Sequence, residues 1–163
     1  NVGKSSLINA LTGRKGLARA SNTPGRTQEI NFFTVGARHY LVDLPGYGYA
    51  NAPVAVVAKW QKLLKQYLSG RQTLRRAFVL IDARHGIKPV DEEILSLMDS
   101  SALAFQVVLT KTDKIKTSER DAVLTQVRGA LAKHPAAFPE IILTSSEKGE
   151  GIATLRSIIA TMV

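Results

Sequence analysis

Hydrophobic side chains change their spacing several times along this chain of 163 residues. Residues 4–11 place their apolar side chains on one helical face, and Gly13 follows as a helix terminator. The runs 30–35 and 39–44 are typical of strands, and the three residues between them suit a hairpin. The first part of the chain is therefore predicted to form a helix, a long polar loop and a β-hairpin.

The rest of the chain alternates helix-type and strand-type patterns. The runs 77–81 and 104–109 are apolar without alternation, as expected of strands that are buried on both faces. The other predicted elements are helices over 54–68, 87–98, 120–131 and 152–162 and a last strand over 140–143. This order predicts an α/β fold with a doubly wound, mostly parallel sheet. Ligands of such sheets bind beyond the carboxyl ends of the strands, so the segments that follow strands should carry the chemistry.

Charge and composition narrow the function further. The 22 Lys and Arg residues outnumber 13 Asp and Glu, and this net charge of +9 favours contact with nucleic-acid phosphates. Cysteine is absent, which excludes disulfides and thiolate metal sites and fits the cytoplasm, and the three histidines lack the spacing of a zinc site. No apolar run approaches the roughly 20 residues that a membrane helix needs. We expect a cytoplasmic monomer with no membrane partner.

The start of the chain matches the second half of the phosphate-binding loop G-x-x-x-x-G-K-[S/T]. In that loop, backbone N–H groups surround phosphate oxygens, the Lys neutralises the β- and γ-phosphates and the hydroxyl ligates Mg²⁺. The first half of the motif and the strand that carries it would precede residue 1. We therefore expect a single domain over 1–163 that lacks its first strand and is truncated within this loop. The loop residues are Asn1, Val2, Gly3, Lys4, Ser5 and Ser6.

A second motif follows the predicted strand 39–44. An Asp at this position holds Mg²⁺ through water, and the N–H of the Gly three residues later reaches the γ-phosphate. A turn that merely ends the strand would favour the same residue types. The residues are Asp43, Leu44, Pro45 and Gly46.

Two further motifs follow the predicted strands 104–109 and 140–143. The first is similar to the guanine-reading motif [N/T]-K-x-D, in which the carboxylate accepts from the ring N–H and the amino group of guanine. Adenine lacks that donor pair and would leave the carboxylate unpaired. The second is similar to a loop whose backbone N–H meets guanine O6, although a helix cap would look alike. The residues are Thr110, Lys111, Thr112 and Asp113, then Thr144, Ser145 and Ser146.

The four motifs occur in the order of a GTPase, and their wider sequence is more specific. The informative stretches are NVGKSSLIN at 1–9, TPGRTQ at 23–28, DLPGYGYA at 43–50 and DARHG at 82–86. On these stretches the chain resembles the EngB (YihA/YsxC) family of bacterial GTPases, within the group that includes TrmE and Era. The resemblance implies a Mg²⁺- and GTP-dependent factor for assembly of the large ribosomal subunit, with a link to cell division and septation.

The resemblance also implies roles for single residues. Gly25, Arg26 and Thr27 would form switch one, with Thr27 as a Mg²⁺ ligand and Thr23 as the competing candidate. The catalytic residues would be Lys4, Thr27 and Gly46, and the metal would be held by Ser5, Thr27 and, through water, Asp43. Asn1 would help to bind a potassium ion near the phosphates. Tyr47 stands where many GTPases carry a water-orienting Gln, so unaided GTP hydrolysis should be slow.

Two other functions stay open from the residues alone. The chain could be a basic module that docks on RNA or the ribosome and has lost nucleotide binding through its truncation. It could also be an ATP-using P-loop enzyme, although Asp113 argues against adenine. Asp91, Glu92 and Glu93 follow Pro89 and are interpreted as capping residues of a helix rather than as catalytic acids.

Overall fold

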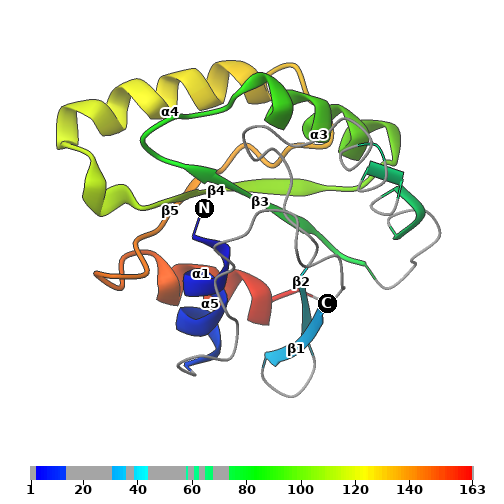
Figure 1. Ribbon diagram of the computed structural model, residues 1–163, viewed down its shortest axis with the longest axis horizontal. Coiled ribbons are helices and arrows are strands. Elements are labelled where there is room, and N and C mark those ends of the chain that lie inside the picture. Colours follow the sequence, from blue (N-terminus) through cyan, green and yellow to red (C-terminus); the bar gives the residue numbers. More distant parts are fainter. Residues whose placement is uncertain are drawn as a thin grey trace.

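In the computed structural model, a parallel sheet lies between two pairs of helices (Figure 1). The structure describes residues 3–13, 31–35, 39–43, 58, 61–62, 65–67 and 74–162. The sheet contains β3 (Ala77–Asp82), β4 (Phe105–Thr110) and β5 (Ile142–Leu143), paired in parallel in that order. Helices α3 (Pro89–Ser100) and α4 (Thr117–Leu131) cover one face, and α1 (Lys4–Thr12) and α5 (Ile152–Ala160) cover the other.

The two faces of the sheet divide the core into two clusters. Side chains alternate along β3 and β4, so Val79 and Val107 face α3 and α4 while Val108 faces α1 and α5. All six residues of β4 are buried, which explains why its sequence is mostly apolar and does not alternate. Leu95 on one side and Leu155 on the other are almost fully enclosed. The prediction of a doubly wound, mostly parallel sheet is confirmed for these three strands.

The predicted hairpin forms a sheet of its own. Strands β1 (Asn31–Val35) and β2 (His39–Asp43) pair antiparallel, with Asn31 opposite Asp43. Within the described residues this pair is not hydrogen-bonded to the β3–β4–β5 sheet. Strand β1 contacts α1, and the His39 imidazole lies 2.8 Å from the carbonyl of Met162 beyond α5. The hairpin is thus attached to the α1–α5 side of the molecule.

Helix ends agree with the sequence within a few residues. Helix α3 begins at Pro89, and the Lys88 N–H donates to the Asp91 carboxylate at 2.7 Å. This confirms the interpretation of Asp91 as a capping residue. Helix α4 starts three residues earlier than predicted because Glu119 accepts the Lys116 N–H at 3.0 Å and caps an additional turn.

The last strand is shorter than the predicted run 140–143. Residues 140 and 141 of this run are not paired with β4, and the Glu140 carbonyl instead accepts a hydrogen bond from the Gln106 side-chain amide at 3.1 Å. Before the interruption, Phe138 N–H donates to Phe105 O at 2.8 Å, and an isolated bridge joins Phe105 to Ala137. Contact with β4 is therefore interrupted between the bridge at Ala137 and the start of β5 at Ile142.

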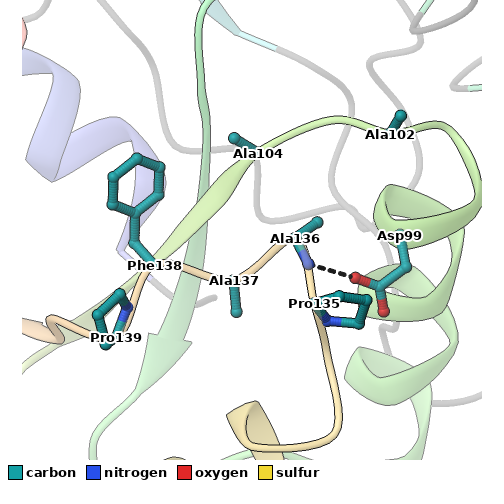
Figure 2. A pocket seen from close by; sticks show the side chains of 8 residues that line it. All are labelled: Asp99, Ala102, Ala104, Pro135, Ala136, Ala137, Phe138 and Pro139. Atoms are coloured by element: carbon teal, nitrogen blue, oxygen red, sulfur yellow. Dashed lines mark hydrogen bonds between the residues drawn. The ribbon is translucent and has the colours of Figure 1, made fainter.

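A hollow of about 550 Å³ lies at the amino ends of β4 and β5 (Figure 2). Figure 2 shows the Ala136 N–H donating to Asp99, and this bond is 3.0 Å long. The hollow is on the opposite edge of the sheet from the segments that carry the sequence motifs, so it is separate from the predicted site. The hollow is lined by Asp99, Ala102, Ala104, Pro135, Ala136, Ala137, Phe138 and Pro139.

None of the helices in the described ranges is long and apolar enough to span a membrane.

His134 connects α3 to the segment after α4. Its Nδ1 lies 2.5 Å from the Asp99 carboxylate and its Nε2 lies 2.7 Å from Glu92, while the ring itself is buried. Glu92 lies in the first turn of α3, as predicted, and its carboxylate also pairs with His134. Burial lowers the pKa of His134, but the hydrogen bonds and charges of Asp99 and Glu92 outweigh burial and raise the pKa above its ordinary 6.5.

The raised pKa predicts a pH dependence of stability. Because the folded pKa exceeds the unfolded one, protonated His134 stabilises the fold at low pH, and this contribution is lost as the pH rises above about 6.5. Thermal unfolding of the unmodified chain should therefore show a melting temperature that falls between pH 6 and pH 9. His134→Gln should flatten this dependence, whereas the exposed His85→Gln should preserve it. A slope that survives His134→Gln would contradict the assignment.

Candidate functional site

Three of the predicted motifs meet at one edge of the molecule. Thr110 is the last residue of β4, Thr144 directly follows β5, and Lys4 begins α1. Because parallel strands end at the same edge, the loops after β4 and β5 become neighbours. Backbone bonds join them, since Thr144 N–H donates to Leu109 O at 2.7 Å and Thr112 N–H donates to Thr144 O at 3.2 Å.

Asp113 is oriented by the loop after β5. It lies in the 3₁₀ turn η1 (Thr112–Lys114), and the Ser145 hydroxyl donates to its Oδ1 at 2.8 Å. The Ser145 hydroxyl in turn accepts the Lys148 N–H at 3.1 Å, which directs its proton toward Asp113. The Ser145 hydrogen bond, assisted by Lys114, outweighs desolvation and lowers the pKa of Asp113. Asp113 is therefore an ionised acceptor at neutral pH, with only 11% of its side chain exposed.

The side chains of Thr112 and Thr144 point into the protein. Thr112 is fully buried and its hydroxyl donates to Thr144 O at 3.0 Å, while the Thr144 hydroxyl donates to Leu109 O at 2.9 Å. These two predicted binding residues thus hold the two loops together through their side chains. Any contact that they make with a ligand would come from their backbone.

A half-buried network behind these loops was not predicted from the sequence. Glu150 accepts two hydrogen bonds from Arg120 of α4, each 3.0 Å long, and contacts the Thr112 hydroxyl. Arg120 and Thr112 lower the pKa of Glu150, so the carboxylate stays charged. Nothing in the run Ser145–Gly151 marks Glu150, because its partner Arg120 is 30 residues away in the sequence. The network connects α4 to the loop after β4 and to the loop after β5, which together are called the base-side loops below.

The phosphate-loop segment lies against the base-side motif. Gly3 has a left-handed conformation with φ of 89°, and a Cβ added there would be 3.6 Å from Lys111 Cε and 3.8 Å from Thr110 Cβ. The Lys111 stem therefore passes along the start of α1. Thr110, which stands at the usual Asn position, packs beside the same glycine, so the replacement keeps this motif close to the loop.

Helix α1 presents its amino end to this edge. Within its described first turn there is no acidic residue and no side-chain cap, and Ser5 and Ser6 follow Lys4 there. The opposite end is held by Arg156 of α5, which donates to Leu11 O at 3.0 Å and to Ala10 O at 2.7 Å. A basic side chain at this carboxyl end also complements the helix dipole. The position of α1 relative to α5 is thereby fixed.

Asp82 at the end of β3 is a second acid that the sequence analysis did not assign. Arg84 donates to it from its backbone N–H at 2.9 Å and from two guanidinium nitrogens at 3.0 and 2.7 Å. Burial alone would raise the pKa of Asp82, but the hydrogen bonds of Arg84 and the charges of Arg84 and Lys111 hold it at about 2. The Lys111 ammonium lies 3.6 Å from Asp82 Oδ2.

Several predicted site residues lie outside the described part of the chain. Asp43 is described only as the backbone end of β2, opposite Asn31. The structure therefore shows where residues 110–113 and the start of α1 lie, whereas both predicted switch segments lie outside the described residues. The residues outside the description are Asn1, Val2, Gly25, Arg26, Thr27, Leu44, Pro45 and Gly46.

Comparison with known proteins identifies the family. The profile of the 50S ribosome-binding GTPases matches residues 1–111, and that of the elongation factor Tu GTP-binding domain matches residues 62–163. The chain is 82% identical over 162 residues to the probable GTP-binding protein EngB of Roseobacter denitrificans, covering 99% of this chain and 75% of that protein. It belongs to the EngB family.

More distant EngB relatives and solved structures agree with this membership. EngB of Sinorhizobium medicae is 57% identical over 172 residues, covering 100% of this chain and 79% of that protein. A crystal structure of a probable GTP-binding protein engB superposes with a TM-score of 0.77 at 25% identity, covering 98% of this chain and 92% of the other. Era in complex with MgGDPNP and 16S ribosomal RNA gives 0.72 at 27% identity, covering 98% and 53%. The fold is that of a P-loop GTPase.

The close contact at Gly151 yields a stability prediction for the base-side loops. Gly151 precedes α5 with φ of 74°, and an added Cβ would lie 2.0 Å from Leu143 O. Gly149, with φ of 78°, has no atom within 4 Å of an added Cβ. Gly149→Ala should cost about 1–2 kcal/mol of unfolding free energy from the left-handed backbone, and Gly151→Ala at least about 2 kcal/mol more. Urea unfolding followed by circular dichroism measures both, and equal losses would contradict the packing described.

Proposed function

We propose that residues 1–163 form a single guanine-nucleotide-binding domain that binds GTP and GDP with Mg²⁺ and hydrolyses GTP. The Asp113 carboxylate carries this proposal, because Ser145 holds it, ionised, between the loops after β4 and β5. Membership of the EngB family supports it independently. The proposed binding residues are those of the four motifs described above.

Guanine suits this arrangement of acceptors and donors. The base offers a ring N–H and an amino group on adjacent atoms, and a carboxylate such as Asp113 accepts from both. The Ser145 N–H already donates to Glu150 O at 3.0 Å, so we assign the Ser146 N–H to guanine O6. Adenine offers no such pair of donors, so it would gain less from this carboxylate than guanine does.

The start of α1 suits a phosphate chain. Gly3 has no side chain to obstruct the approach, the first turn holds no acid, and the dipole of α1 favours an anion at this end. The Ser5 hydroxyl follows directly and is a hard oxygen ligand of the kind that Mg²⁺ takes. We propose that Lys4 neutralises the phosphates and that Ser5, Thr27 and, through water, Asp43 would hold the metal. When bound, Mg²⁺ supplies positive charge to the phosphate oxygens.

The remaining roles follow from the family. We propose that Thr27 and Gly46 belong to the two switch segments, which the γ-phosphate would order. The net charge of +9 supports contact with ribosomal RNA, and the family profile that matches residues 1–111 is described as that of 50S ribosome-binding GTPases. We therefore propose a role in assembly of the large ribosomal subunit in the cytoplasm, with the link to cell division and septation that the EngB resemblance implies.

Replacement of the base-reading carboxylate tests the proposed function. In the full-length gene product, Asp113→Ala should weaken binding of fluorescent GDP by about 10- to 100-fold, because two donors of guanine lose their acceptor. The preference for GDP over ADP, measured by competition, should fall by a similar factor. Asp121→Ala removes an exposed carboxylate from α4 and serves as the matched control with unchanged binding. An unaltered preference in Asp113→Ala would refute guanine recognition.

The hydrolysis rate should depend on what surrounds the phosphates. We propose that Asn1 helps to bind K⁺ and that Tyr47 does not orient water, so unaided turnover should be at or below about 10⁻³ s⁻¹. GTP turnover by the full-length protein should rise when K⁺ replaces Na⁺, or when 50S subunits are added. Equal rates in Na⁺, in K⁺ and with subunits would contradict this part of the proposal.

A further inference from the structure

Asp82 lies beside the proposed base site without belonging to any of the four motifs. It ends β3 directly opposite Thr110, which ends β4, so its carboxylate emerges at the same edge of the sheet. Only 7% of its side chain is exposed. Burial of a carboxylate costs desolvation free energy. Its hydrogen-bond and ion-pair partners therefore indicate which groups it holds in place.

The partners of Asp82 lie on two sides. Arg84, whose side chain is 44% exposed, binds both carboxylate oxygens from the solvent side. Lys111 approaches Oδ2 at 3.6 Å from the base-side loop, and 31% of its side chain is exposed. The Lys111 backbone is left-handed with φ of 58°, a conformation that non-glycine residues adopt rarely. Two unusual features, a buried acid and a left-handed lysine, thus meet in one ion pair.

The position of the Lys111 stem indicates the role of the ion pair between Lys111 and Asp82. The stem passes within van der Waals distance of where a Gly3 side chain would be, so it lies between the phosphate loop and Asp82. A lysine stem held there has its ammonium fixed at one end and its backbone fixed at the other. It would lose little rotamer freedom when a ligand covers it, which is how preorganisation raises affinity.

We propose that Asp82 is a positioning residue for guanine-nucleotide binding, which acts by holding the Lys111 ammonium so that the Lys111 stem is preset for the ligand. This inference rests on the proposed function and adds a residue to it. Asp82 itself touches neither base nor phosphate in this account. Its effect on affinity must therefore pass through Lys111.

The loop that carries Asp82 is rigid enough for this task. The Ile87 N–H donates to Gln126 Oε1 at 3.0 Å, and Gln126 Nε2 donates back to Ile87 O at 3.0 Å, which fixes the end of the loop on α4. The His85 and Gly86 N–H groups both donate to Asp82 O, at 3.0 and 3.1 Å. These bonds fix the backbone at Asp82, and the three hydrogen bonds from Arg84 orient its carboxylate.

The test is a double-mutant cycle in the full-length protein, with GDP affinity and thermal stability as separate readouts. Asp82→Asn should weaken fluorescent GDP binding by about three- to tenfold, the range of a single partly buried ion pair. Lys111→Met keeps an unbranched apolar side chain but removes the ammonium. In the Lys111→Met background, Asp82→Asn should change GDP affinity by less than about twofold, because the two effects are coupled.

A matched control separates positioning from general destabilisation. Asp91 is another buried carboxylate that accepts a backbone N–H, and its contacts lie at the start of α3, away from the base-side loops. Asp91→Asn should lower the melting temperature and leave GDP affinity unchanged. If Asp82→Asn weakens GDP equally in both backgrounds, or does not weaken it in the unmodified one, the positioning role is refuted.

Measurement of Asp113→Ala beside these variants distinguishes a failure of the Asp82 inference from a failure of the proposed function. If Asp113→Ala loses guanine preference while Asp82→Asn binds GDP normally, the proposed function stands and this inference alone fails. If Asp113→Ala keeps its preference, both fail. Coupled loss at Asp82 and Lys111 together with loss of preference at Asp113 supports both.

Discussion

The hydrogen bond between Ser145 and Asp113 depends on two strands that end at the same level. Val108 and Leu109 of β4 pair with Ile142 and Leu143 of β5, and the chain leaves both strands on the same side of the sheet. Without these two residue pairs, Asp113 and Ser145, which are 32 residues apart in sequence, would not form a 2.8 Å hydrogen bond. The arrangement that we propose reads the base is therefore a consequence of the parallel pairing of β4 with two residues of β5.

Two ion pairs surround the hydrogen bond between Ser145 and Asp113. Glu150 with Arg120 braces the loops from α4, and Asp82 with Arg84 braces the lysine from β3. Each pair includes a carboxylate whose pKa is lowered by its arginine, so both stay ionised at neutral pH. The side chains nearest the proposed ligand are thus fixed by the scaffold, which is the arrangement that precise recognition requires.

The sequence predicted the elements well because the local signals were strong. Gly13 marked a helix end, and the largely apolar run before Thr110 marked a central strand. It overestimated β5 because Ile141 continues the apolar pattern, although the Glu140 carbonyl bonds to the Gln106 side chain and neither residue pairs with β4. Three of the four motifs could be predicted because each lies at the end of a predicted strand, and the phosphate-binding loop was predicted from its own sequence.

The supporting residues could not be predicted in this way. Asp82 lay within a stretch used for the family resemblance, but its pairing with Lys111 spans 29 positions and leaves no local pattern. Glu150 and His134 are similar cases, since their partners are brought close only by the packing of helices α3 and α4. Tertiary ion pairs of this kind carry no sequence period, so a single sequence does not reveal them.

Competition of unlabelled nucleotides against labelled GDP on the unmodified full-length protein tests the central claim most directly. Inosine diphosphate keeps the ring N–H of guanine but lacks its amino group, and ADP lacks both donors. The account predicts the order GDP, then inosine diphosphate weaker by about tenfold, then ADP weaker still, because Asp113 loses one donor and then two. Equal competition by GDP and inosine diphosphate, or effective competition by ADP, would show that Asp113 does not read the base.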